Sequence, residues 1–460
     1  MRSSGRLETS TLAYCCAISL AAVACDRHDD APALSRTESV VRDAPEPPEN
    51  GPKLGAIAEV VRVREYTDKR APSLGELRAG ARVARSAQPV SRAGCEGGWY
   101  AVRPRGFVCV GVEATLDLNH PTLAAMALAP RVDAALPYTY ARARNETPLF
   151  ERLEGDGEAV REVGKLRRRS AMAVVGSWKA KEPSGAESRL ALLTDGRFVR
   201  ASDLEAAKPS DFSGIELDKS AGLPVAFVVK RGVRTFGLEG SQVEKGDLVD
   251  YHSRLLLSGR FRSVGSVKYW AVDAVMGKPQ PAGGAERWVR HQDVTVVQKR
   301  ATFPDFVKDD TRWLDASVAT DTLVLYEGRR PVFVTLLSVA RELDFEATDT
   351  EPASDGPRPI PLGVVRVTQK TLTLASDKAP GFGEPFEVTD APWGLQLSSG
   401  QLLHGAYWHD RFGIEHGAGT FALSPADAAR VFRFVGPAVP AGWHAIAAGP
   451  EHATPVVIRK

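Results

Sequence analysis

The sequence predicts a mainly β protein built from several small units, with short helices in only a few places. Runs such as IAEVVRVREY (57–66) alternate apolar and polar residues, and Gly and Pro interrupt such runs along most of the 460-residue chain. The segment LVLYEGRRPVFV (323–334) places two apolar runs on either side of a turn, which is typical of a β-hairpin. SPADAARVFRFV (424–435) has helical periodicity, and Ser424 and Pro425 suit the start of a helix.

The composition is that of folded, soluble domains. Apolar residues make up 43% of the chain and charged residues 25%, and the net charge is +2. The length predicts about three domains. No basic stripe with interleaved aromatic residues occurs in the sequence, so we expect no nucleic-acid partner.

The N-terminus has the pattern of an export signal. Arg2 and Arg6 precede an apolar run, Leu12 to Cys25, that is too short to span a bilayer. The small residues before Cys25 resemble the lipobox of bacterial lipoproteins, although Ala22 stands where Leu is usual. This resemblance implies removal of residues 1–24, lipidation of Cys25, and an anchor on the periplasmic side of a bacterial membrane. An ordinary secretory signal, cut near Ala24, or a short anchor is the alternative.

Cysteine use agrees with export. Cys15 and Cys16 fall within the predicted signal and Cys25 would carry lipid, so only Cys95 and Cys109 remain. An even pair in an exported protein predicts a disulfide, and a loop of about 15 residues would contribute roughly 3 kcal/mol. A metal-binding pair is the alternative, but further ligands are missing nearby. Residues 25–52 are rich in Pro and charge and predict a disordered tether.

The next segments read as β-rich units. GELRAGARV (75–83) and GGWYAVRPRGFVCVG (97–111) resemble a bacterial SH3-like domain, which implies a small β-barrel over 53–115 with both cysteines on neighbouring strands. We expect a linker with short helices over 116–170 and a β-rich middle region over 171–305. Aromatic-Val pairs recur at 106–112, 197–204 and 287–294, which indicates further SH3-like units, unless such pairs are simply common in strands.

Residues 306–460 resemble the catalytic domain of the L,D-transpeptidase family, the YkuD type. The matching segments occur in family order: DASVATDTLVLYEGRRPVFVTLLS (315–338), PIPLGVVRV (359–367), DAPWGLQLSSGQLLHGAYWHDRFG (390–413) and LSPADAARVF (423–432). The resemblance implies a β-sandwich with short helices at its C-terminus. Family members cross-link peptidoglycan stem peptides through a Cys thioester, with a His that moves the proton and backbone amides that hold the oxyanion.

The residues that carry this chemistry are replaced. His404 matches the family's upstream His, and without gaps the Ser-His-Gly-Cys signature falls on Gly417, Ala418, Gly419 and Thr420. A gapped register aligns the His-Gly pair with His416 and Gly417, which leaves Ala418 in place of the Cys. Neither register supplies a thiol. The resemblance therefore implies a degenerate site, beside which we expect Trp393, Tyr407 and Trp408 to line a substrate groove.

Two other chemistries are open to this loop. Thr420 is a candidate nucleophile if His404 or His416 acts as its base, although a β-branched alcohol is a poorer nucleophile than a thiolate. His404, His409 and His416 are ligand types that zinc accepts, but their spacing fits no compact metal motif. We expect neither a metal nor another cofactor.

The function expected from the sequence is that of an envelope-anchored, non-catalytic L,D-transpeptidase homologue. It would bind peptidoglycan stem peptides or envelope proteins and act as a scaffold in cell-wall organisation. One alternative is an active peptidoglycan transpeptidase or peptide hydrolase that uses Thr420. Another is a structural lipoprotein whose SH3-like unit binds wall peptides or a partner.

Overall fold

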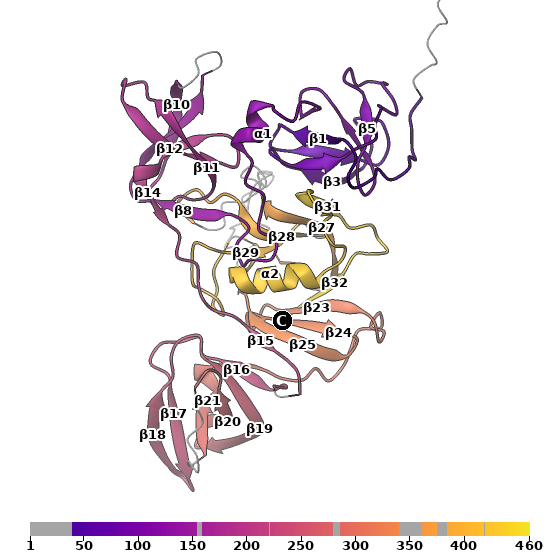
Figure 1. Cartoon of the computed structure of the whole chain (residues 1–460). Helices are drawn as coiled ribbons and strands as arrows, with labels where there is room; N and C mark the ends of the chain where they lie inside the picture. Colours follow the sequence, from indigo (N-terminus) through magenta and orange to yellow (C-terminus); the bar gives the residue numbers. More distant parts are fainter. Residues whose placement is uncertain are drawn as a thin grey trace, which may run out of the picture. The chain divides into compact units, whose positions relative to one another are not determined.

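A computed structural model describes residues 39–153, 159–219, 221–278, 286–339, 360–374, 384–417 and 419–460. The predicted mainly β fold is confirmed, since 45% of residues are in strands and 6% in helices. Two short α-helices, α1 (Pro121–Ala125) and α2 (Pro425–Phe434), occur in these ranges. No helix among them is long and apolar enough to cross a membrane. Figure 1 shows the order of the elements along the chain.

The first module, residues 53–115, consists of seven short strands. One sheet has the order β4-β1-β7, while β2 pairs with β3 and β6, and β6 pairs with β5. Buried aliphatic side chains such as Leu54, Val63 and Leu77 form its core. The strands are β1 (Lys53–Ala56), β2 (Val61–Arg64), β3 (Ser73–Leu77), β4 (Arg82–Ala84), β5 (Trp99–Ala101), β6 (Phe107–Cys109) and β7 (Ala114–Thr115). Its likeness to an SH3 domain stays a prediction.

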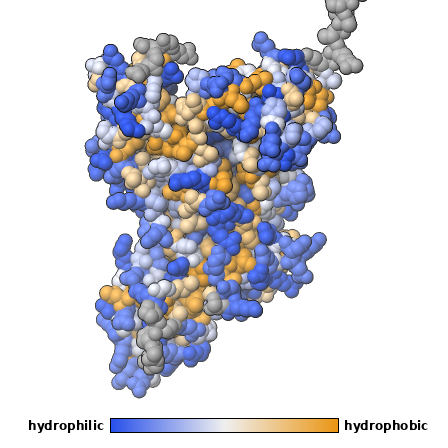
Figure 2. All heavy atoms as spheres, viewed as in Figure 1, coloured by the Kyte–Doolittle hydropathy of each residue, from blue (hydrophilic) through white to orange (hydrophobic). Residues whose placement is uncertain are grey.

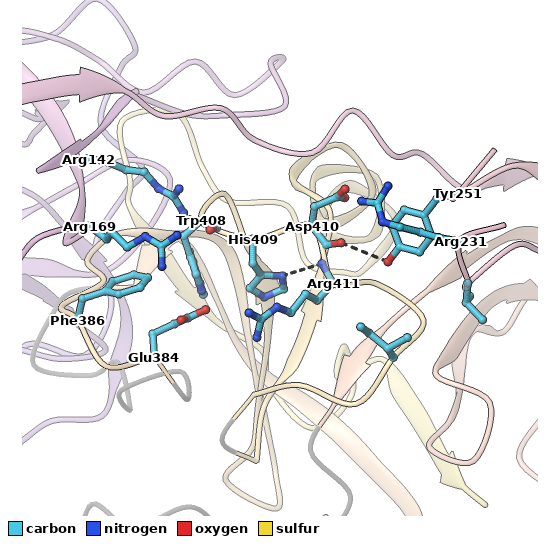
Figure 3. Close-up of a pocket in the computed structure, with 12 residues that line it drawn as sticks. Arg142, Arg169, Arg231, Tyr251, Glu384, Phe386, Trp408, His409, Asp410 and Arg411 are labelled. Atoms are coloured by element: carbon cyan, nitrogen blue, oxygen red, sulfur yellow. Dashed lines mark hydrogen bonds between the residues drawn. The ribbon is translucent and has the colours of Figure 1, made fainter. Parts of the chain in front are cut away.

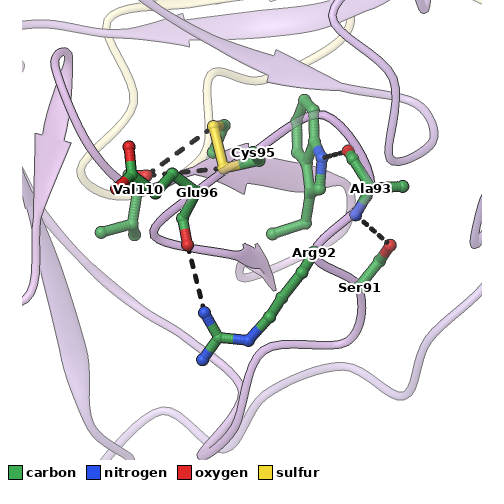
Figure 4. Close-up of a disulfide and its surroundings, with 8 residues drawn as sticks. Ser91, Arg92, Ala93, Cys95, Glu96 and Val110 are labelled. Atoms are coloured by element: carbon green, nitrogen blue, oxygen red, sulfur yellow. Dashed lines mark hydrogen bonds between the residues drawn. A yellow bond between two sulfur atoms is a disulfide. The ribbon is translucent and has the colours of Figure 1, made fainter. Parts of the chain in front are cut away.

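A disulfide joins Cys95 to Cys109 in this module (Figure 4). The two Cα atoms are 5.9 Å apart, and both sulfur atoms lie close to the carbonyl oxygen of Val110. The expectation that both cysteines lie on neighbouring strands is wrong for one of them: Cys109 ends β6, but Cys95 lies in the loop before β5. The bond thus ties this loop to the neighbouring hairpin.

The predicted tether is wrong for residues 40–52, nearly half of its length. Residues 40–52 contain no helix or strand, yet they pack against the first module. The backbone N–H of Val41 donates to Thr67 Oγ1 at 2.8 Å, and Arg103 Nη1 lies 2.8 Å from Glu46 Oε1. Val41 and Ala44 also contact the buried cluster around Trp99. Apolar contacts of this kind are what an unfolded spacer lacks.

The middle of the chain forms two modules with the same topology. The second module has the strand order β10-β9-β13-β12-β11-β8-β14 and the third β18-β17-β21-β20-β19-β16-β22, so each strand has a counterpart eight numbers later. The second contains β8 (Thr139–Ala143), β9 (Thr147–Arg152), β10 (Val160–Leu166), β11 (Ala171–Lys181), β12 (Glu187–Leu193), β13 (Phe198–Arg200) and β14 (Leu204–Ala206). The third contains β16 (Val225–Phe227), β17 (Arg234–Glu239), β18 (Gln242–Leu248), β19 (Arg254–Val264), β20 (Val267–Val275), β21 (Arg287–Arg290) and β22 (Thr295–Val297).

This repeat explains two of the three aromatic-Val segments. In both middle modules the segment forms a strand, a 3-10 turn and a second strand, with the turns at Ala201–Asp203 and His291–Asp293. The segment at 106–112 lacks that turn. The predicted linker over 116–170 is wrong from residue 139 onward, because β8, β9 and β10 occupy it.

The C-terminal region forms a sheet with α2 on one side. The predicted hairpin is confirmed as β24 paired with β25, and Ser424 caps α2 with Pro425 at its first position. The buried face of α2 packs on β28, with the rings of Phe432 and Trp393 5.2 Å apart. The strands are β23 (Arg312–Ser317), β24 (Thr322–Glu327), β25 (Arg330–Leu336), β26 (Ser338–Val339), β27 (Gly363–Leu374), β28 (Ala391–Leu397), β29 (Leu402–Gly405), β30 (Phe421–Leu423), β31 (Ala445–Ala447) and β32 (Pro455–Arg459).

The first and second modules and the segment between the middle modules pair with this region through their backbones. Strand β3 of the first module pairs with β31, Ala171 of the second module bridges Val388, and β15 (Ile215–Glu216), between the middle modules, pairs with β25. These pairings bring residues of distant sequence to the loop between β29 and β30.

Candidate functional site

The two ends of the loop between β29 and β30 hold His404 and Thr420 against each other. The strands are parallel, with His404 opposite Ala422, so Thr420 lies just before β30 and beside the imidazole. His404 Nε2 is 3.1 Å from Thr420 Oγ1, and His404 Nδ1 is 3.1 Å from the carbonyl oxygen of Gly405. Since a carbonyl only accepts, Nδ1 carries the proton and Nε2 accepts from the Thr420 hydroxyl. This is the arrangement of a nucleophile and its base.

The pair is shut away from solvent. His404 is fully buried and Thr420 is 3% exposed. The indole of Trp408 stacks on the imidazole, with 5.6 Å between ring centroids. Burial lowers the pKa of His404 to about 4, which keeps the ring neutral at pH 7.

His416 and His409 occupy the outer part of the loop. Arg411 Nη1 donates to His416 Nδ1 at 3.1 Å, so His416 Nε2 carries a proton and donates to Glu384 Oε1, also at 3.1 Å. The backbone N–H of Arg411 donates to His409 Nδ1. Burial, followed by electrostatic interactions with His416 and other neighbours, lowers the pKa of His409 to about 2. Across the described ranges, no three His, Cys, Asp or Glu side chains are grouped as metal ligands.

A cavity of about 450 Å³ lies over this loop (Figure 3). Four arginines from three parts of the chain line it together with two carboxylates, so its wall has an excess of positive charge. Trp408 and His409 line it, whereas His404 and Thr420 do not. The charged lining residues are Arg142, Arg169, Arg231, Arg411, Glu384 and Asp410.

The two middle modules contribute to this cavity through the same turn. Arg169 in the second module and His252 in the third are both in the left-handed region, with φ of 75° and 64°, and each precedes the long strand of its module. Arg169 lines the cavity, and so does Tyr251, next to His252. The Tyr251 hydroxyl donates to the Asp410 carbonyl at 3.4 Å, and His252 Nδ1 lies 3.4 Å from Asp410 Oδ1. Equivalent turns of the second and third modules therefore both lie at the cavity over the loop between β29 and β30.

The structure brings only some of the predicted site residues together. His404, Gly419 and Thr420 lie at the inner end of the loop and His416 at its outer end, while Ala418 and Cys25 lie outside the described residues. The predicted groove of Trp393, Tyr407 and Trp408 does not form. Trp408 lines the cavity, Tyr407 is a core residue whose hydroxyl donates to Thr389 O, and Trp393 lines a different cavity. No sequence motif indicates the four arginines as one group, because they come from separate modules.

No model of a protein family matches the sequence, and no curated protein matches it. Solved structures of L,D-transpeptidases are similar to parts of the chain. One from Xylanimonas cellulosilytica is 15% identical with a TM-score of 0.24, and the match covers 34% of this chain and 64% of that chain, which is less than two thirds of its length. L,D-transpeptidase 1 from Mycobacterium tuberculosis is 17% identical with a TM-score of 0.21, over 55% of this chain and 98% of that chain.

An L,D-transpeptidase from Mycobacterium smegmatis is 13% identical with a TM-score of 0.24, and the match covers 45% of this chain and 91% of that chain. Likenesses at these identities and TM-scores carry no argument about activity. The function proposed below is therefore argued from the residues of this chain.

Proposed function

We propose that this protein binds peptidoglycan stem peptides in the arginine-lined cavity and does not catalyse their transfer. The observation that carries the proposal is the separation of the two parts of the site. The cavity ends at Trp408 and His409, and the His404–Thr420 pair lies buried behind them. A ligand in the cavity contacts arginine and aromatic side chains and does not reach the Thr420 hydroxyl.

The charge of the cavity suits a peptide that carries carboxylates. Guanidinium groups bind carboxylates in two-pronged geometry, and they are the usual choice where such recognition matters. Among the described residues the Arg231 side chain forms no ion pair, and its guanidinium group lies 5.1 Å from the centroid of the Tyr251 ring. The segments at 359–367, 390–413 and 423–432 that resemble the transpeptidase family supply the peptidoglycan part of the proposal.

Replacing Arg231 by Ala is expected to weaken the binding of a tetrapeptide muropeptide about tenfold, the loss typical of one charge-assisted hydrogen bond. Isothermal titration with the native protein and the variant measures this. Arg260→Ala is the matched control, since Arg260 is an exposed arginine of the same module that pairs with Glu286 outside the cavity. Equal losses in both variants, or no binding by the native protein, would contradict the proposal.

Catalysis is tested separately with the same preparation. We expect no covalent adduct with a carbapenem in mass spectrometry and no cross-linked product from muropeptides. Loss of a nucleophile or base costs on the order of 10⁶ in turnover in an unrelated hydrolase, which leaves little rate to detect. An adduct or a cross-linked product overturns the non-catalytic part of the proposal and leaves the binding part to the titration.

The contact between His404 and Thr420 favours a second candidate, a peptide transferase or hydrolase with Thr420 as nucleophile. The His404 tautomer leaves Nε2 as the acceptor, which this chemistry requires. If muropeptides are consumed, Thr420→Val, which keeps the shape and removes the hydroxyl, is expected to abolish turnover. Thr420→Ser should retain part of it. Turnover unchanged in the Val variant would exclude Thr420 as the nucleophile.

We also propose a lipid anchor at Cys25 that holds the protein on the periplasmic side of a bacterial membrane. The support is the run of small residues before Cys25 and the polar stretch after it. In cells grown with a palmitate analogue, Cys25→Ala is expected to lose the label and to leave the membrane fraction. Cys16→Ala, nine residues earlier in the same apolar run, is the control and should keep both.

A further inference from the structure

A second and larger cavity, of about 740 Å³, lies between the first module and the C-terminal region. Its lining comes from the turn after β3, the chain after α1, strands β27 and β28, α2 and the loop before β31. Leu128 and Val132 line it and are about half exposed, so the cavity reaches the surface. Apolar and hydrophilic side chains lie next to one another on the face that carries α2 (Figure 2).

The wall of this cavity is mostly apolar and rich in rings. Trp393, Trp443 and Phe432 contribute large apolar surfaces, and aliphatic residues such as Leu372 and Val439 fill the space between them. Its volume falls within the range of about 300–1,000 Å³ that small-molecule sites occupy. Four cationic side chains and one carboxylate also line it, namely Arg78, Arg82, Lys370, Arg433 and Asp133.

Lys370 is the unusual member of this wall. It is only 2% exposed, and its ammonium group donates to the carbonyl oxygen of Val435 and lies 4.5 Å from the centroid of the Phe432 ring. No carboxylate of the described residues pairs with it within ion-pair distance. Burial lowers the pKa of Lys370 to about 8, so the group is still mostly protonated at pH 7.

A buried ammonium without a counter-ion is costly, and proteins usually pair such groups. The other cations of the wall are engaged: Arg78 with Asp390, Arg82 with the carbonyl of Leu123, and Arg433 with the carbonyl of Val132. Lys370 has three donors and uses one of them on Val435. A ligand with one anionic group would supply the missing charge, and its apolar body would cover the rings.

We propose that this cavity binds a small amphipathic carboxylate, an apolar acyl or aryl molecule whose single carboxylate pairs with Lys370. The site is separate from the arginine-lined cavity, because the two share no lining residue. The inference therefore does not depend on the proposed binding of stem peptides. A polar peptide would leave the ring-lined wall uncovered, whereas an acyl chain or an aromatic ring buries it.

Dodecanoate and 2-naphthoate serve as probes, each against the matching alcohol, in isothermal titrations with the purified full chain. The native protein is expected to bind at least one carboxylate about tenfold or more tightly than its alcohol, since the alcohol lacks the charged hydrogen bond. Preference for dodecanoate identifies an acyl ligand, and preference for 2-naphthoate an aromatic one. Equal binding of acid and alcohol in both pairs, or no binding of any probe, overturns the proposal.

Lys370→Met then tests the residue. The variant keeps an unbranched apolar chain of similar length, so it should fold, and its melting temperature provides the check. It is expected to bind acid and alcohol equally, through loss of affinity for the acid alone. Lys245→Met is the matched control, because Lys245 is exposed on β18 outside the cavity, and it should retain the native preference. An unchanged preference in Lys370→Met would overturn the assignment of Lys370.

Discussion

Asp390→Ala is expected to lower the free energy of unfolding by about 3–5 kcal/mol, the range found when one partner of a buried ion pair is removed. Asp390 is 1% exposed, and its Oδ1 lies 2.8 Å from Arg78 Nη1, which is itself buried. Its other oxygen accepts from Thr194 Oγ1 at 2.6 Å. Arg78 belongs to the first module, Thr194 to the second and Asp390 to the C-terminal region, so one carboxylate joins three parts of the chain.

Two variants separate the charge from the shape. Asp390→Asn retains hydrogen bonds and tolerates the left-handed backbone at this position, where φ is 54°, so its smaller loss would measure the cost of the missing charge. Arg78→Met together with Asp390→Ala removes both charges and should recover part of the stability. Urea unfolding monitors all of these.

Glu151→Ala is the matched control for this prediction. It breaks the ion pair between Glu151 and Arg161, whose side chains are 42% and 63% exposed, respectively. Removal of an exposed ion pair is expected to cost less than about 1 kcal/mol. Comparable losses at Glu151 and Asp390 would show that the buried cluster does not join the modules.

Local signals were enough to predict the hairpin and the helix of the C-terminal region. Both have short-range causes: a Gly turn between apolar runs at 323–334, and a Ser cap before Pro425. Strand β10 had no such signal. Its five central residues are exposed and do not alternate, and it is held by pairing with β9, whose Leu149 and Phe150 are buried. The sequence of this charged segment therefore predicts a linker and not a strand.

The sequence was enough to predict the His404–Thr420 pair, but it did not predict the arginine-lined cavity. The sequence named His404 and His416 as possible bases for Thr420, and the parallel pairing of β29 with β30 selects His404. The arginine-lined cavity depends instead on a duplicated turn and on contacts between modules. Arg142 and Arg231 are 89 positions apart and share no motif, so only the tertiary arrangement reveals them as neighbours of one cavity.

Acidification is expected to destabilise the protein through the same buried histidine. The pKa of His404 is lowered to about 4 in the folded state by burial, against 6.5 for an ordinary histidine. The unfolded chain then binds more protons between these values, so stability is full above pH 6.5 and is lost as the pH falls toward 4. The loss attributable to His404 reaches about 3 kcal/mol near pH 4. His409, whose pKa is also lowered, acts in the same direction.

Asp427 has the opposite effect on stability as the pH falls, so the experiment must cancel its contribution. Burial raises its pKa to about 6, so its contribution to stability grows as the pH falls from 6 toward 3.8. The difference between the native protein and His404→Gln, each unfolded in urea at pH 7, 5.5 and 4.5, cancels Asp427. This difference should shift steadily in favour of the variant as the pH falls. His452→Gln, at an exposed histidine, should run parallel to the native protein. If His404→Gln runs parallel as well, His404 is not held neutral, and the closed inner site inferred from its burial is wrong.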